Sequence, residues 1–178
     1  MLAHLPDTNL VETHAMSFGD DLLAVRLLID QQLIRDLLLQ YFTNVDRRVW
    51  APVKEVFAPG VLVDYSDLMP IGDAVAADEV VDRIAEAVGI YAVTVHQMGN
   101  CEITVGTETA VSETWVNAHH VYADPERNEG RMPIAGLRYQ DNWQRTPDGW
   151  RITMRRAFTD WRAWWEPRPP TYVGGVHQ

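Results

Sequence analysis

The sequence lacks the features that define several large classes of protein. Cys101 is the only cysteine, which excludes an intrachain disulfide framework and a cysteine-rich zinc site. No stretch approaches the roughly 20 apolar residues that a membrane-spanning helix needs. The chain also carries no glycine-rich phosphate-binding loop, no Gly-x-Ser-x-Gly element and no His-Glu-x-x-His motif. These absences favour a protein that works without a nucleotide, flavin or metal cofactor.

Positive charge is scarce as well. Lys and Arg number 15 against 25 Asp and Glu, for a formal net charge of −10. Because such a surface repels nucleic-acid phosphates and anionic lipids, we expect neither nucleic acid nor membrane as a partner. The N-terminal stretch MLAHLPDTNLVETHAM lacks the basic start and the continuous apolar run of a signal peptide, which predicts a cytoplasmic protein.

Apolar and aromatic residues are plentiful. The 178 residues are 47% hydrophobic and include seven tryptophans, enough for one ordinary domain. An aromatic-rich core and an apolar ligand cavity both fit this composition. We divide the chain into an irregular N-terminal arm (1–19), one folded domain (20–166) and a Pro/Gly-rich tail (167–178).

Hydrophobic periodicity predicts helices first and strands afterwards. Three- and four-residue spacing indicates an amphipathic helix from Asp20 to near Phe42, with Asp46 in the following turn, then helices over 48–57 and 74–88. Between the last two lies a short strand, 60–67. From residue 91 the period becomes two, which predicts strands at YAVTVHQMGN, CEITVG, AVSETWVNAHHVYA, IAGLRYQDNWQRT and GWRITMRRAFTDW. This order predicts an α+β cone or half-barrel, in which N-terminal helices wrap a curved, mostly antiparallel sheet around an apolar pocket.

Polar residues within apolar stripes are the candidates for function. Strict alternation in the last strand places Arg156 on one face with Trp150, Ile152, Met154 and Phe158. If that face is inward, Arg156 needs an anion or several acceptors. The alternative is a position near the rim, where its guanidinium reaches water.

His96 and Asp46 have alternatives of the same kind. A histidine within a strand is either a structural hydrogen-bonder or a general base. A carboxylate just after a helix C-terminus is electrostatically unfavourable unless it finds a cation or a proton donor, although Asp46 could simply form a turn. In the strand AVSETWVNAHHVYA, His119 shares a face with Trp115 and Asn117, whereas His120 shares the other with Val116. Only one of the two histidines can face a pocket.

The stretch YFTNVDRRVWAPVKEVFAPGVLVDY, followed by VHQMGN and DGWRITMRR, resembles the SnoaL-like branch of the nuclear-transport-factor-2-like superfamily over roughly residues 25–160. That branch includes scytalone dehydratase, bile-acid dehydratase and hexachlorocyclohexane dehydrochlorinase. The resemblance implies that Asp46 and His96 form a carboxylate–histidine dyad and that Tyr41 and Tyr65 hold a substrate oxygen. It also implies that Arg156 is a pocket arginine and that His119, less favourably His120, is a second pocket histidine.

The predicted function is a cofactor-independent lyase, a dehydratase acting on a small apolar cyclic substrate such as a polyketide, terpenoid or steroid. His96 would be the base, oriented by Asp46, with Tyr41 and Arg156 stabilising negative charge. The remaining predicted pocket residues are Tyr65, His119, Trp50, Trp115, Asn117, Trp143 and Met154.

Two other functions fit the same residues. One is a ketosteroid-type isomerase or polyketide cyclase, and the other a non-catalytic small-molecule-binding domain. A metal site at Asp46, His96 and His119 is a further alternative, but its spacing matches no familiar motif, and we predict none. The family resemblance implies a homo-oligomer, either a dimer or a trimer. The aromatic-rich FTDWRAWWEPRPP segment is expected to dock on the pocket or on a neighbouring subunit.

Overall fold

A computed structural model describes residues 18–166, so most of the predicted N-terminal arm and all of the predicted C-terminal tail lie outside the described residues. Helix α1 spans Phe18–Arg47 and is followed by the short helix α2, Trp50–Glu55. α1 is longer than the predicted helix, because the segment after Phe42 contains no Gly or Pro and Val45 is buried in the core. It ends where Arg48 adopts a left-handed conformation with φ of 59°. Asp46 therefore lies in the last turn of α1, not in a loop after it.

Only the C-terminal half of α1 packs into the core. Its buried apolar residues are Ile34, Leu38, Tyr41, Phe42 and Val45, whereas Leu22, Leu23, Val25, Leu28, Ile29 and Leu33 are exposed. The apolar residues of the predicted amphipathic helix are thus not all buried in the core: those in its first half are exposed. The predicted homo-oligomer would bury such an exposed apolar face. The homo-oligomer stays a prediction. A sedimentation measurement that gives a monomer would contradict it.

The main sheet has four long antiparallel strands in the order β3-β4-β5-β6. They are β3 (Tyr91–Val105), β4 (Thr109–Tyr122), β5 (Met132–Thr146) and β6 (Gly149–Trp165). The two predicted strands YAVTVHQMGN and CEITVG form the single strand β3, which stays paired with β4 across an irregularity between Met98 and Cys101. One extra residue at that point bends the strand without ending it.

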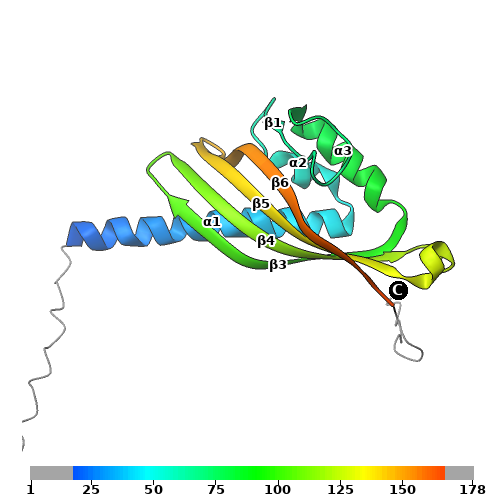
Figure 1. The fold of residues 1–178 in the computed structure, drawn as a ribbon. Helices are drawn as coiled ribbons and strands as arrows, with labels where there is room; N and C mark the ends of the chain where they lie inside the picture. The colour runs from blue at the N-terminus through cyan, green and yellow to red at the C-terminus, as the bar shows by residue number, and fades with distance from the viewer. Residues whose placement is uncertain (1–17, 167–178) are drawn as a thin grey trace, which may run out of the picture.

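The remaining helices and short strands lie together beside β6 (Figure 1). β1 (Leu62–Val63) and β2 (Val75–Ala76) form a two-stranded antiparallel sheet, and α3 (Ala77–Val88) follows directly. Isolated parallel bridges Phe57↔Ile152 and Asp64↔Arg156 connect this region to β6. The loop between β4 and β5 contains a 3-10 turn, η1 (Arg127–Gly130). This is the predicted α+β cone, with helices and a curved antiparallel sheet enclosing the core.

A partly buried ion pair fixes α1 to the β5–β6 hairpin. Asp30 is 3% exposed, accepts hydrogen bonds from the Arg145 guanidinium (2.5 and 2.9 Å) and receives another from Trp150 Nε1 (3.1 Å). The hydrogen bonds from Arg145 lower the pKa of Asp30. No helix within residues 18–166 is both long and apolar enough to span a bilayer.

Candidate active site

Asp46 and His96 are in direct contact. The last turn of α1 places Asp46 against β3, where its Oδ1 lies 2.6 Å from His96 Nδ1. The backbone N–H of His96 donates to Asp46 Oδ2 (2.8 Å), and Thr94 Oγ1 donates to Asp46 Oδ1 (2.9 Å). Because Asp46 is bonded to Nδ1, the Nε2 atom of His96 is left for the pocket that the ring lines.

These donors stabilise the Asp46 carboxylate at an unfavourable position. It lies at the helix C-terminus, where the backbone dipole is negative. Partial burial acts to raise the pKa of Asp46, but the hydrogen bonds from the His96 side chain and backbone outweigh it and lower this pKa below its ordinary value. Asp46 is therefore ionised at neutral pH and can stabilise a positive charge on His96.

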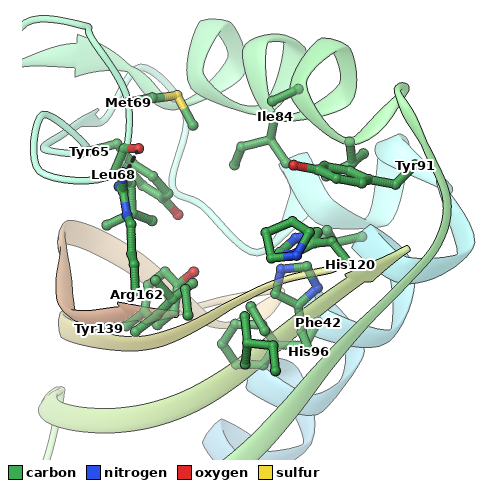
Figure 2. Close-up of a pocket in the computed structure, with 18 of the residues that line it drawn as sticks. Phe42, Tyr65, Leu68, Met69, Ile84, Tyr91, His96, His120, Tyr139 and Arg162 are labelled. Atoms are coloured by element: carbon green, nitrogen blue, oxygen red, sulfur yellow. Dashed lines mark hydrogen bonds between the residues drawn. The ribbon is translucent and has the colours of Figure 1, made fainter. Parts of the chain in front are cut away.

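The pocket is a cavity of about 380 Å³ between the helices and the concave face of the sheet (Figure 2). Its wall is mainly apolar and aromatic, as expected for a small-molecule site. The lining residues are Tyr41, Phe42, Val45, Tyr65, Leu68, Met69, Ile84, Ala87, Val88, Tyr91, His96, Ala118, His120, Tyr122, Pro133, Ile134, Ala135, Leu137, Tyr139, Arg162, Ala163 and Trp164.

Two tyrosine hydroxyls meet at the pocket wall. Tyr41 and Tyr65 are hydrogen-bonded through their hydroxyl oxygens at 2.9 Å, and both side chains are buried. Burial, reinforced by the neighbouring Tyr65, raises the pKa of Tyr41 well above its ordinary value, so it remains a protonated donor at any physiological pH. The structure thus places both predicted tyrosines on the pocket, where they can hold a substrate oxygen.

A buried ion pair supports these tyrosines from behind. Arg155 is fully buried and donates from Nε and Nη2 to the two carboxylate oxygens of Asp141 at 2.6 and 2.8 Å. Its Nη1 lies 3.4 Å from the Tyr65 hydroxyl, and its guanidinium carbon lies 4.5 Å from the Tyr41 ring centroid. Burial acts to lower the pKa of Arg155, but Asp141 outweighs it and raises that pKa. The pair is therefore charged, and it holds the tyrosine cluster in place.

His120, not His119, faces the pocket. Its ring meets the His96 ring edge-on at a centroid distance of 5.6 Å and also contacts Tyr91. His119 pairs with the exposed Val95 and does not line the pocket, so the preference for His119 is wrong. The buried residues Thr114, Val116 and Ala118 alternate toward His120, and this signal marks the inner face.

The position of His120 predicts a pH-dependent stability. Burial, reinforced by the charge of His96, lowers the pKa of His120 to about 4 from an ordinary 6.5. The unfolded chain then binds a proton that the native state excludes, so stability is full above pH 6.5 and is lost as pH falls toward 4. In the native protein this pKa difference lowers the free energy of unfolding by at most about 3 kcal/mol between these pH values. We expect the His120→Gln variant not to show this decrease. Urea unfolding of both proteins across this range measures the difference; equal pH dependence would contradict it.

Arg156 lies outside the pocket. β6 contains one extra residue, Thr153, between the pairs Asn142↔Met154 and Trp143↔Ile152. This bulge shifts the alternation by one, so Arg155 points inward and Arg156 outward. Arg156 is 58% exposed in its side chain and forms an ion pair with Asp64 (3.1 Å). The prediction of a pocket arginine at 156 is therefore wrong.

Five other predicted pocket residues also lie elsewhere. Trp143 is buried in the core and donates to Ser112 Oγ (2.9 Å), and Trp50 packs against the core without reaching the cavity. Trp115 and Asn117 share the outer face of β4 with His119. Met154 follows the bulge and is 38% exposed. Strict alternation failed for Met154 as it did for Arg156. Trp143 points inward as predicted, but it is buried in the core and does not line the cavity.

The alternative metal trio is not assembled either. His119 lies on the opposite face of the sheet from His96, and residues 18–166 contain no group of three or more His, Cys, Asp or Glu side chains that could hold a metal ion. Sequence reasoning missed Tyr91, Tyr139 and Arg162 as pocket residues. Arg162 belongs to the aromatic-rich segment predicted to dock. The described part of that segment continues β6, and its Trp164 reaches the pocket wall.

Comparison with known proteins identifies the family. Residues 26–156 match the model of the SnoaL-like domain, and the chain belongs to this family, within the nuclear-transport-factor-2-like superfamily. A relative in Mycobacterium tuberculosis, an uncharacterised protein, is 30% identical over 134 residues, which cover 75% of this chain and 88% of the relative.

Solved structures share the fold. A protein from Kribbella flavida superposes with a TM-score of 0.69 at 17% identity, over 76% of this chain and 94% of its own. A scytalone dehydratase-like protein from Novosphingobium aromaticivorans gives 0.65 at 18% identity, over 84% and 97%. A type 2 hexachlorocyclohexane dehydrochlorinase gives 0.67 at 13% identity, over 84% and 99%. At these identities the similarity establishes the fold alone.

Proposed function

We propose that the protein is a lyase of the dehydratase type, acting on a small, largely apolar cyclic molecule. The observation that carries the proposal is the Asp46–His96 pair, whose Nδ1 contact of 2.6 Å leaves Nε2 for the pocket. Structural relatives that include a dehydrochlorinase and a scytalone dehydratase-like protein support elimination as the reaction type.

The proposed reaction begins at a carbon next to a carbonyl group. His96 Nε2 removes a proton from that carbon, the C–H electrons form an enolate, and Asp46 stabilises the resulting imidazolium. The Tyr41–Tyr65 hydroxyl pair donates to the enolate oxygen. The enolate then re-forms the carbonyl and expels the β-hydroxyl group. That group leaves as water with the proton returned from His96, so the product is the substrate minus one water.

Each protein group has a suitable state for this role. Asp46 is ionised because hydrogen bonds lower its pKa, and the raised pKa of Tyr41 keeps its hydroxyl protonated. The apolar wall excludes water, which strengthens the hydrogen bonds to developing charge. Base, acid and oxyanion donors are all side chains of this chain, so the scheme uses no cofactor.

The same groups would support a ketosteroid-type isomerase or a polyketide cyclase. In the isomerase the proton returns to a different carbon and nothing leaves. Product mass separates the reactions. We expect cyclic β-hydroxy-carbonyl compounds incubated with the protein to lose the mass of one water. Conversion at unchanged mass would indicate the isomerase, and no conversion of any compound would favour a non-catalytic binding domain.

A further inference from the structure

The pocket has one permanently charged side chain. Among the lining residues, none is acidic and none is lysine, so the Arg162 guanidinium is the only group there that is charged at every physiological pH. Asp46 stands behind His96 and does not line the cavity. A single cation in a mainly apolar wall is the arrangement that binds one anionic group of a ligand.

Arg162 also differs from the other arginines of the last two strands. Arg138, Arg145, Arg155 and Arg156 each hold a carboxylate. Arg151 and Arg162 have none in the part of the chain that the structure describes, and of these two only Arg162 lies on the pocket. Arg162 is therefore the one arginine of these two strands that lines the pocket, and it does so without a carboxylate partner among the described residues.

The contacts of Arg162 leave most of its donors free. Its Nη2 donates to the backbone oxygens of Leu68 (3.2 Å) and Asp67 (3.5 Å) and to Thr159 Oγ1 (3.2 Å). These neutral acceptors fix the side chain across the pocket wall without neutralising it. Within residues 18–166, Nε and Nη1 have no hydrogen-bond partner, so they are available to an anion.

Arg162 lies across the cavity from His96. In Figure 2, Arg162 and Tyr139 lie on one side of the cavity, while His96, His120 and Tyr91 lie on the other. Arg162 and the proposed base His96 therefore lie on opposite sides of the cavity, with Tyr65 on the side of Arg162 (Figure 2). A ligand that fits both carries an anionic group at one end and its reacting carbon at the other.

We propose that Arg162 binds a carboxylate of the substrate, so that the substrate is a cyclic carboxylic acid and not a neutral ring compound. This rests on the proposed function only in taking the cavity as the substrate site. The net charge of −10 disfavours anions at long range, but direct contact with the guanidinium of Arg162, an exposed residue at the edge of the apolar wall, outweighs a screened distant repulsion.

The test is the binding of 2-naphthoate and cinnamate, each compared with its neutral amide, by calorimetry of the full chain. These compounds need no turnover, so the result does not depend on whether the protein is a dehydratase. We expect at least one of the two acids to bind about tenfold tighter than its amide. Arg162→Gln should bring acid and amide within about twofold, mainly by weakening the acid.

Two further variants test whether the preference for the acid comes from the charge of Arg162 or from its contacts with the loop containing Asp67 and Leu68. Arg162→Lys keeps the charge but loses the fork, and it should retain a preference for the acid of about threefold or more. Arg156→Gln removes the same charge from the outer face of β6 and should leave the preference unchanged. Equal binding of acid and amide to the native protein, absence of acid binding, or a preference that survives Arg162→Gln would each overturn the proposal.

Discussion

Replacing His96 by alanine is expected to lower kcat on the true substrate by about 10³-fold, with a much smaller change in KM. The reason is that His96 Nε2 takes part in the transition state, whereas substrate binding relies on the apolar wall and the tyrosines. His119→Ala is the matched control, because His119 lies on the outer face of β4 and does not line the pocket. Its kcat should remain within about twofold of the native value.

Asp46→Asn tests the orienting half of the pair. Thr94 and the His96 backbone donate to different oxygens of the carboxylate, and the amide has only one oxygen, so it can accept only one of these hydrogen bonds. It can also no longer stabilise an imidazolium, and it favours the wrong tautomer. We expect kcat to fall by about 10²-fold or more. The double variant Asp46→Asn with His96→Ala should be no worse than His96→Ala alone, because the two residues act as one unit. Additive losses would contradict the dyad.

Asp141→Asn is expected to destabilise the fold by about 3–5 kcal/mol, the largest stability effect of any single change considered. It removes the counter-charge of Arg155, a guanidinium with no exposed surface that has only Asp141 as its carboxylate partner among the described residues. The uncompensated charge is then buried among Tyr41, Tyr65 and Tyr139. Urea unfolding measures the difference.

The control for this prediction removes both charges. Arg155→Met combined with Asp141→Leu should recover much of the lost stability, because an apolar pair leaves no unpaired ion. The double variant should nevertheless lose activity, because Arg155 no longer holds the Tyr65 hydroxyl. A double variant as unstable as Asp141→Asn would contradict the account of the buried charge.

Much of the fold was predictable because its signals are local. The change from helical to two-residue periodicity near residue 91 separated the helices from the sheet, and α3 was placed within three residues. The full extent of α1 was not predictable from spacing, since its end at Arg47 depends on the burial of Val45. The exposed first half of α1 also defeated periodicity, because an apolar stripe does not say what covers it.

The candidate site, like the fold, was predictable only in part. Asp46 and His96 were candidates from their places in the sequence, and the family resemblance joined them as a dyad and added Tyr41 and Tyr65. All four lie at or directly behind the pocket wall. The failures at Met154 and Arg156 share one physical cause. A single extra residue at Thr153 reverses the faces of β6, exchanging Arg156 for Arg155, and no local pattern in RITMRR marks it.

Arg162 was missed for another reason. It lies near the end of β6, where most side chains are exposed and alternation carries little information about a pocket. Its role depends on the loop containing Asp67 and Leu68, about ninety residues earlier in the sequence. Contacts of that range are set by the tertiary fold, which spacing along one strand cannot supply.

The most direct test of the central claim follows the proton that His96 is proposed to remove. Cyclic ketones and β-hydroxy-carbonyl compounds are incubated in D₂O, and deuterium at the carbon next to the carbonyl is measured by mass spectrometry and NMR. With the native protein and with His119→Ala, we expect the hydrogen at that carbon to be exchanged for deuterium or to be lost in the product. With His96→Ala, we expect only the uncatalysed rate. Exchange at the native rate by His96→Ala would contradict it, as would product formation by the native protein with that C–H bond intact.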